Sequence, residues 1–153
     1  MRSCWVIRCL VLIACTVAFS SLLEAKQLAV VTDNENPTAN VSVADLQKIF
    51  NLRTRNWGDG KPVVVVMRDP SATAMQLVLR KLLNMTPEQA SSFVQSHKGS
   101  IVVADSDEAL IRFVSANRGA IGVVDLYSLT KDVRVLKVDG KLPVEQGYLL
   151  RGE

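Results

Sequence analysis

The chain has 153 residues, of which 48% are hydrophobic and 22% are charged, and its formal net charge is +3. This length and composition suit one globular domain with a sizeable core, and so small a charge gives no argument for a nucleic-acid or anionic-membrane partner. All three cysteines (Cys4, Cys9 and Cys15) lie near the start of the chain. Residues 26–153 therefore have no disulfide and no thiol chemistry.

Residues 1–25 have the pattern of a secretory signal peptide. Arg2 gives a positive start, a short apolar run follows, and Ala25 is a small residue at the expected cleavage position. We therefore predict a signal peptide over residues 1–25, one domain over residues 26–153, and a periplasmic or secreted protein. A Leu-Ile-Ala-Cys run ending at Cys15 resembles a bacterial lipoprotein box, so a lipid anchor through Cys15 is the alternative.

The pattern of apolar residues after position 26 predicts alternating strands and helices. The predicted strands cover residues 27–32, 63–67, 100–104, 120–124 and 132–138. The predicted helices cover residues 41–50, 74–83, 87–98 and 106–118. Residues 142–151 are predicted to be a frayed end or one last edge strand, and no later segment is long and apolar enough to span a membrane. This order indicates an α/β fold, a three-layer sandwich with a mostly parallel central sheet.

Polar residues mark the starts of three predicted helices. Ser42 is the predicted N-cap of the first helix, with Asp45 three residues further on, as in a capping box. Thr86 is followed by a proline, which is typical of a helix start. Either Asp105 or Ser106 caps the last predicted helix.

Two aromatic or titratable residues favour a structural interpretation. Trp57 lies near Arg53 and Arg55, but two charges are too few for a nucleic-acid patch. We therefore predict that Trp57 anchors its loop on the core. His97, the single histidine of the chain, falls in the last turn of its helix, where a partial positive charge suits the helix dipole.

The turn after the second predicted strand is the candidate ligand site. Arg68 supplies a planar cationic fork of donors, and Ser71 and Thr73 supply hydroxyl groups. The N–H groups at the start of the next helix favour an anion. In the structural alternative, Asp69 is the N-cap and Pro70 the first helical residue, so the carboxylate fills the anion position itself.

The residue patterns that catalysis commonly uses do not occur in the sequence. There is no His, Cys, Asp and Glu cluster at metal-binding spacing, no Gly-x-Ser-x-Gly elbow, no phosphate loop and no dinucleotide fingerprint. Asp69, Asp105 and Asp125 all follow predicted strands, but carboxylates at such places are most often helix caps. We predict a protein that is not an enzyme and that has no metal or cofactor; a small exported enzyme is the weaker alternative.

Four segments together resemble the phosphate-binding proteins of ABC importers, which belong to the type 2 periplasmic binding protein superfamily. They are residues 42–50, 57–62, 68–73 and 119–124, in the order and spacing of that family. The resemblance covers almost all of residues 26–153 and implies one lobe of that fold. It also implies a function: an exported solute-binding domain for phosphate or a similar oxyanion that works with a membrane transporter or a sensor protein.

The resemblance also implies site residues. In that family an Arg and then Ser, Gly and Thr at a helix start grip the phosphate, which carries over to Arg68, Ser71, Ala72 and Thr73, with alanine at the glycine position. One residue fewer separates Arg68 from Ser71 than in the usual pattern. The second lobe of the family supplies a threonine-containing loop and a Ser and Asp pair, for which Thr32 and the loop after it are the only stand-in. The predicted phosphate ligands are therefore Arg68, Asp69, Ser71, Ala72, Thr73 and Thr32. The alternative function is an interaction module on the same fold that has lost the ligand site and binds a protein.

Overall fold

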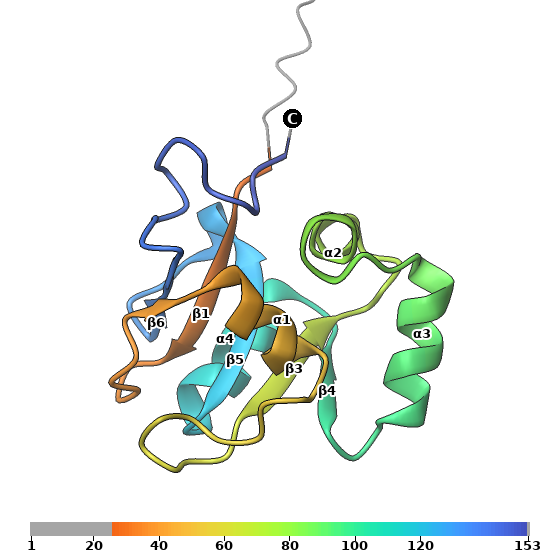
Figure 1. Cartoon of the computed structure of the whole chain (residues 1–153), viewed down its shortest axis with the longest axis horizontal. Coiled ribbons are helices and arrows are strands. Elements are labelled where there is room, and N and C mark those ends of the chain that lie inside the picture. The colour runs from red at the N-terminus through yellow and green to blue at the C-terminus, as the bar shows by residue number, and fades with distance from the viewer. Residues whose placement is uncertain (1–25, 153) are drawn as a thin grey trace, which may run out of the picture.

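Runs of β-branched residues form the middle layer of the molecule in a computed structural model that describes residues 26–152 (Figure 1). The predicted signal peptide and the lipoprotein box lie outside the described residues. The central sheet has five strands in the order β4-β3-β5-β1-β6. Their bounds are β1 (Leu28–Asp33), β3 (Val64–Arg68), β4 (Ile101–Ala104), β5 (Ala120–Asp125) and β6 (Val133–Val135).

The strands of this sheet run mostly in one direction. β3 is parallel to both β4 and β5, whereas β1 is antiparallel to both β5 and β6. Four strands therefore point one way and β1 points the other, which confirms the predicted mostly parallel sheet. Leu28, at the start of β1, faces Asp125, at the end of β5. The residues after β1 consequently lie at the opposite edge of the sheet from the residues after β3.

Helices cover both faces of the sheet, and this confirms the three-layer sandwich. α4 (Asp107–Ala116) packs on one face, against β1, β3 and β5. The opposite face is covered by α1 (Val43–Phe50) and by α2 (Thr73–Val78), which continues as the π-helical segment η1 (Leu79–Leu83). α3 (Pro87–Ser96) lies on the β4 side of the sheet (Figure 1). None of the helices within residues 26–152 is long and apolar enough to cross a membrane.

Alternate residues of the buried strands enter two separate cores. In β1, Leu28 and Val30 pack with α1 and α2, whereas Ala29 and Val31 pack with α4. All four are fully buried. This explains why residues 28–31 are all apolar: a strand segment covered on both faces has no side that needs polar residues.

The predicted helix caps are present in the structure. The Oγ atom of Ser42 accepts a hydrogen bond from the N–H of Asp45 at 3.0 Å. Thr86 forms a complete capping box with Gln89. At α4 the cap is Ser106, whose Oγ atom accepts from the backbone N–H three residues on at 3.0 Å. These caps satisfy N–H groups that have no partner inside the helix.

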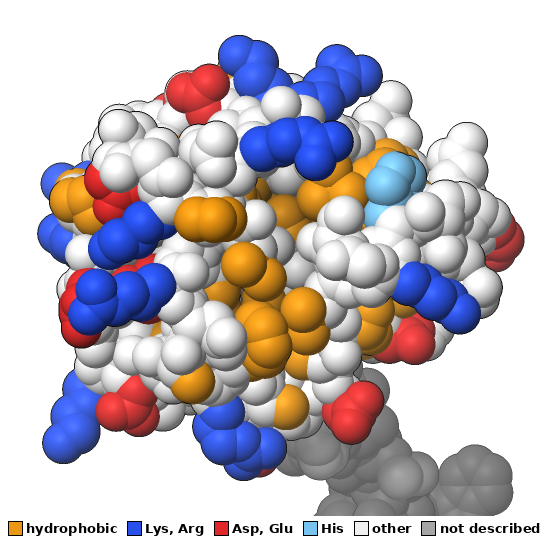
Figure 2. Space-filling view, turned by 90° about the horizontal axis from the view of Figure 1, so that it is seen from below, with side chains coloured by type: hydrophobic (Ala, Val, Ile, Leu, Met, Phe, Trp, Pro, Cys, Tyr) orange, Lys and Arg blue, Asp and Glu red, His pale blue; other side chains and the backbone are white. Residues whose placement is uncertain are grey.

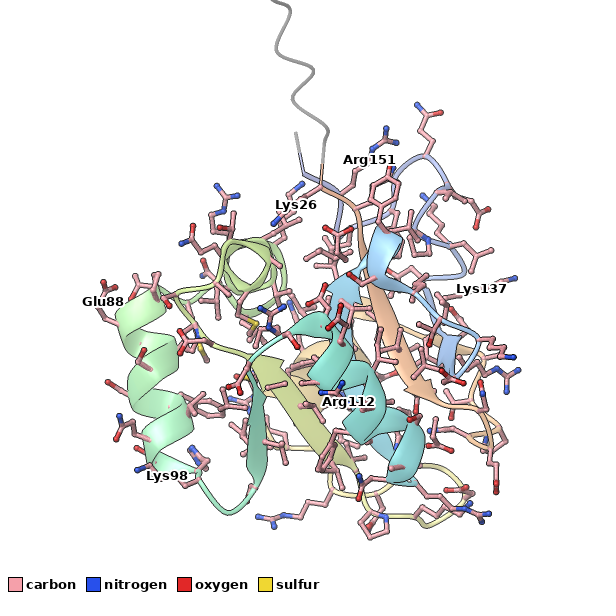
Figure 3. The ribbon with its side chains drawn as sticks, turned by 180° about the vertical axis from the view of Figure 1, so that it is seen from behind. Lys26, Glu88, Lys98, Arg112, Lys137 and Arg151 are labelled. Carbon is pink, nitrogen blue, oxygen red and sulfur yellow. The ribbon has the colours of Figure 1, made fainter. Side chains whose placement is uncertain are left out.

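Two expectations about the end of the chain are wrong. The predicted strand over residues 132–138 is divided at the buried Leu136: β6 stays in the main sheet, and β7 (Lys137–Val138) pairs in parallel with β2 (Asn40–Val41). Residues 142–150 form mostly turns and Arg151 forms a single β-bridge with Gln27, so this segment is neither frayed nor an edge strand. Leu150 is fully buried, and its carbonyl accepts from the N–H of Leu28 at 3.0 Å. Lys26 and Arg151 consequently lie side by side at the two ends of the described chain (Figure 3).

The prediction that Trp57 anchors its loop is confirmed. The side chain is 7% exposed and belongs to the larger core. Its Nε1 atom donates to the carbonyl of Gly119 at 2.9 Å. The same carbonyl accepts from the N–H of Val64 at 3.0 Å, and the N–H of Gly119 donates to the carboxylate of Asp33 at 2.9 Å. Gly119 therefore joins the loop before β3 to the chain just before β5.

The burial of the Tyr148 hydroxyl predicts that the protein loses stability in strong base. Burial raises the pKa of its hydroxyl to about 12, although the Val30 backbone opposes part of this shift. In the unfolded chain a tyrosine loses its proton near pH 10, so the unfolded state gains stability between about pH 10 and pH 12. We expect the free energy of unfolding to fall by about 2 to 3 kcal/mol over this range. Urea denaturation at each pH measures it.

The matched control is the other tyrosine. Tyr148→Phe should remove this part of the pH dependence, because phenylalanine has no proton to lose. Tyr127→Phe should leave it in place, since the Tyr127 side chain is 77% exposed. If both variants lose stability between pH 10 and 12 as the unchanged protein does, burial of Tyr148 is not the cause.

Candidate functional site

Three parallel strands end at one edge of the sheet, and polar residues follow each of them. Arg68 at the end of β3 is paired in register with Ala104 at the end of β4. Asp105 follows β4, and Asp125 ends β5. The carboxyl ends of parallel strands in open α/β sheets are where ligands bind, so this edge is the candidate site.

The guanidinium group of Arg68 is held by α4. Its Nη1 atom donates to the Oδ1 atom of Asp107, and its Nη2 atom donates to the carbonyl of Asp105 at 3.1 Å. The side chains of Arg68 and Asp107 are 19% and 13% exposed. The Nε atom of Arg68 is buried without a hydrogen-bond partner among the described residues. Arg68 is thus a largely buried cation with a fixed position and with donors to spare.

The Asp107 carboxylate connects the ends of β3 and β5. While its Oδ1 atom accepts from Arg68, its Oδ2 atom accepts from the N–H of Asp125 and from the Oγ atom of Ser128, both at 3.0 Å. In the sequence, Asp107 is only an acidic residue in the first turn of a predicted helix, which gives no reason to place it at a ligand site. The signal that could have identified its role is the strand pairing, which places Arg68 beside the end of β4 and the start of α4.

The Asp69 carboxylate belongs to the turn and not to the helix. Its Oδ1 atom accepts from the N–H of Ser71 at 2.8 Å and from the Ser71 Oγ atom at 2.5 Å. The hydrogen bond from the Ser71 hydroxyl, followed by that from the Ser71 N–H, lowers the pKa of Asp69. The interpretation of Asp69 as N-cap and Pro70 as the first helical residue is wrong, because α2 begins at Thr73 with Ala72 as N-cap.

The first turn of α2 has no side-chain cap. The N-cap residue, Ala72, has no side-chain group that could accept a hydrogen bond. No side chain of the described residues makes a capping hydrogen bond to this helix start. Ser71 and Thr73 are exposed, and Ala72 is half-buried. The predicted residues from Arg68 to Thr73 therefore share one turn at the sheet edge, which carries a fixed cation at one end and an uncapped helix start at the other.

Thr32 does not join this turn. It is fully buried near the end of β1, which runs against β5, so it lies toward the opposite edge of the sheet from Arg68. Its Oγ1 atom donates to the carbonyl of Ala120 at 2.8 Å and accepts from the Nδ2 atom of Asn36 at 3.1 Å. The prediction that Thr32 contributes to the same site as Arg68 is therefore wrong, and the physical reason is the direction of β1.

The acidic residues of the edge do not form a metal-binding group. Among residues 26–152, no three His, Cys, Asp or Glu side chains lie close enough together to hold a metal ion. The carboxylates of Asp69 and Asp107 accept hydrogen bonds from backbone N–H groups and hydroxyls instead.

Comparison with known proteins gives a family match over most of the chain. A family model described as a PBP superfamily domain matches residues 18–147. No curated protein sequence matches the chain.

Several solved structures share its fold. PstS from Borrelia burgdorferi superimposes with a TM-score of 0.68 at 20% identity, over 84% of this chain and 55% of that one. An ABC-type phosphate transport receptor from Vibrio cholerae gives a TM-score of 0.65 at 21% identity, over 84% and 54%. A protein described as a phosphate ABC transporter substrate-binding protein, solved with bound phosphate from Clostridium perfringens, gives 0.67 at 20% identity, over 78% and 47%. The chain thus spans about half the length of these proteins.

Proposed function

The chain belongs to the PBP superfamily, and from this premise we propose that it is a solute-binding domain for phosphate or a similar oxyanion. The observation that carries the proposal is the turn over residues 68–73, which contains both a cation fixed by Asp107 and an uncapped helix start. The descriptions of two of the similar solved structures, from Clostridium perfringens and Vibrio cholerae, name phosphate transport, and they support the choice of anion.

The chemistry of the turn suits a tetrahedral oxyanion. Arg68 keeps donors that neither Asp107 nor the Asp105 carbonyl occupies, and a guanidinium group forms strong charge-assisted bonds to phosphate. The Thr73 hydroxyl and the first N–H groups of α2 supply further donors without adding charge. Because Asp107 already holds the guanidinium, little side-chain freedom is left to lose on binding.

Asp69 gives the proposed site a preference between anions. Its lowered pKa keeps the carboxylate ionised at neutral pH. An ionised carboxylate can accept a hydrogen bond from a protonated phosphate, whereas sulfate has no proton to donate and is repelled. We therefore propose that the turn selects phosphate over sulfate.

Arg68→Ala is expected to weaken phosphate binding by about tenfold to a hundredfold. One charge-assisted hydrogen bond contributes roughly 1.5–3 kcal/mol, which corresponds to this change in the dissociation constant. Arg68→Lys should recover only part of the affinity, because lysine presents a point charge and not a planar fork. Isothermal titration calorimetry with phosphate measures all three proteins.

The control is an arginine of the same charge elsewhere on the surface. Arg80 is exposed on η1, so Arg80→Ala should bind phosphate as the unchanged protein does. Far-UV circular dichroism checks that Arg68→Ala remains folded. Equal phosphate affinity in Arg68→Ala and the unchanged protein would show that this turn is not the phosphate site.

The second candidate function is a protein-interaction module that has no ligand at this turn. The observation that favours it is that both Arg68 and the Ser71 N–H already have carboxylate partners, Asp107 and Asp69. The same titration separates the two functions. If the unchanged protein releases or absorbs no heat with phosphate at millimolar concentrations, the result contradicts phosphate binding and favours the protein-interaction module.

We also propose that the domain over residues 26–153 is exported after removal of residues 1–25 and that it acts with a membrane transporter or sensor. The proposal rests on the apolar run after Arg2 and the small residue Ala25. Mass spectrometry of the protein recovered from the cell envelope gives the start of the mature chain. A cytoplasmic chain that still begins at Met1 would contradict export, and a lipid on Cys15 would replace a free protein with an anchored one.

A further inference from the structure

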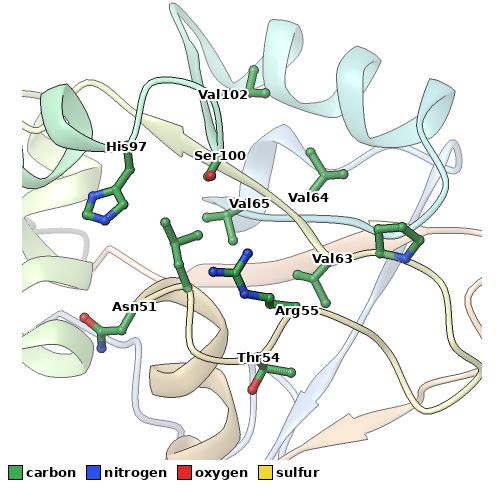
Figure 4. A pocket seen from close by; sticks show the side chains of 12 residues that line it. Asn51, Thr54, Arg55, Val63, Val64, Val65, His97, Ser100 and Val102 are labelled. Atoms are coloured by element: carbon green, nitrogen blue, oxygen red, sulfur yellow. The ribbon is translucent and has the colours of Figure 1, made fainter.

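A groove lies at the beginning of β3, at the other end of the strand from the Arg68 turn (Figure 4). It has a volume of about 420 Å³, within the range typical of sites for small molecules. Its walls come from the loop after α1, the end of α3 and the first residues of β3 and β4. Nothing in the proposed phosphate site accounts for this groove.

The floor of the groove is apolar. Leu52 from the loop after α1 and Val63 just before β3 are partly exposed there, and Val65 of β3 lies beneath them in the larger core. Figure 2 shows this end of the molecule from outside, where hydrophobic side chains reach the surface beside the histidine and beside Lys and Arg side chains. Such a floor favours the hydrocarbon part of a ligand, because burying it removes apolar surface from water.

One wall of the groove carries an unpaired positive charge. The guanidinium group of Arg55 extends over the groove (Figure 4). Within residues 26–152 Arg55 forms no ion pair, and the groove lining contains no Asp or Glu. The backbone beneath it is fixed, since the Arg55 carbonyl accepts from the N–H of Val63 at 2.9 Å. The charge is therefore presented from an anchored position and is free to bind an anion.

The opposite wall adds polar groups. The Nδ1 atom of His97 lies 2.7 Å from the Phe93 carbonyl, which can only accept, so Nδ1 carries the proton. In the neutral ring the Nε2 atom is then an acceptor. The hydroxyl groups of Ser100 and Thr54 also line the groove. These groups orient a ligand without competing with Arg55 for a carboxylate.

We propose that this groove binds a small organic carboxylate with an apolar body. The carboxylate pairs with the fork of Arg55, which fits its two oxygens, while the body lies on Leu52 and Val63. A neutral apolar molecule would leave Arg55 unpaired, and inorganic phosphate would leave the apolar floor in water. Only a ligand with both parts satisfies the charge and the floor together.

The experiment is a titration of the ¹⁵N-labelled protein, followed by amide chemical shifts. The probe is benzoate, which has a carboxylate and a flat apolar ring; benzamide keeps the ring without the charge, and acetate keeps the charge without the ring. Each is added to about 20 mM, because a dissociation constant on the order of 1 mM is expected for ligands of this size. We expect saturable shifts with benzoate at the amides of residues 63–65, 99 and 100, and at least about tenfold weaker binding of benzamide and acetate.

Matched variants test the role of the charge. Arg55→Gln should weaken benzoate binding by about tenfold or more, and Arg55→Lys by less. Arg112→Gln, an equal loss of charge at an exposed position on α4, should leave it unchanged (Figure 3). Equal affinity for benzoate and benzamide, unchanged binding in Arg55→Gln, or the absence of saturable shifts would overturn the proposal. Shifts at residues 71–73 instead of the groove would also overturn it, because benzoate would then act as an oxyanion at the other turn.

Discussion

Gly119→Ala is expected to lower the free energy of unfolding by about 4 kcal/mol or more, which is among the largest effects of a single substitution. Gly119 has a φ angle of +83°, in the left-handed region that alanine adopts only with strain. A Cβ atom there would lie 2.1 Å from the carbonyl oxygen of Pro62, so backbone must move. The movement would disturb the two hydrogen bonds that the Gly119 carbonyl accepts, from Trp57 and Val64, and the one that its N–H donates to Asp33. Urea denaturation followed by circular dichroism measures the loss.

Gly58 provides the matched control. It lies in the same loop region as Trp57, and a Cβ atom added there would meet no atom within 4 Å. Gly58→Ala should therefore change the free energy of unfolding by less than about 0.5 kcal/mol. If Gly119→Ala is no less stable than Gly58→Ala, the close approach of Gly119 to Pro62 does not constrain the fold.

Trp57→Ala is expected to lower the free energy of unfolding by about 3 to 5 kcal/mol, the usual result of removing a buried tryptophan. The side chain is 7% exposed, so its loss leaves a large void between the loop and the core. The Gly119 carbonyl also loses the hydrogen bond from Nε1, although it keeps the one from the Val64 N–H. Thermal and urea unfolding give the change.

Trp57→Phe separates the two contributions. Phenylalanine keeps much of the apolar volume but cannot donate to the Gly119 carbonyl, so the loss should be smaller than for alanine. A melting temperature for Trp57→Ala equal to that of the unchanged protein, together with lost ligand binding, would show that the residue belongs to a binding site and not to the core.

Local patterns predicted the elements of the fold well. Apolar runs identified β1, β3 and β5, and the caps at Ser42, Thr86 and Ser106 depend on residues three positions apart, which a sequence shows directly. The division of one predicted strand into β6 and β7 at Leu136 was missed. An apolar residue at this position gives the same sequence pattern whether the chain stays in one sheet or enters a second one.

The candidate site was only partly predictable. Arg68, Ser71 and Thr73 lie close together because they are close in sequence. Thr32 lies away from these residues because β1 runs antiparallel to β5. Apolar periodicity contains no information about strand direction, so the sequence could not show this. The contact of Arg68 with Asp107 depends on two strands being neighbours across 39 positions of the chain, which no local pattern reveals.

The adjacency of the two ends of the described chain has a consequence for how such a domain can be joined to other chains. Gln27 and Arg151 form a β-bridge, and the N–H of Gly152 donates to the carbonyl of Lys26 at 2.6 Å. A domain whose ends meet can be inserted into a surface loop of another protein without separating the two sides of that loop. For the same reason a short linker can join the two ends, and new ends can be made at the exposed turn over residues 58–60. This circular permutation leaves every layer of the sandwich in place.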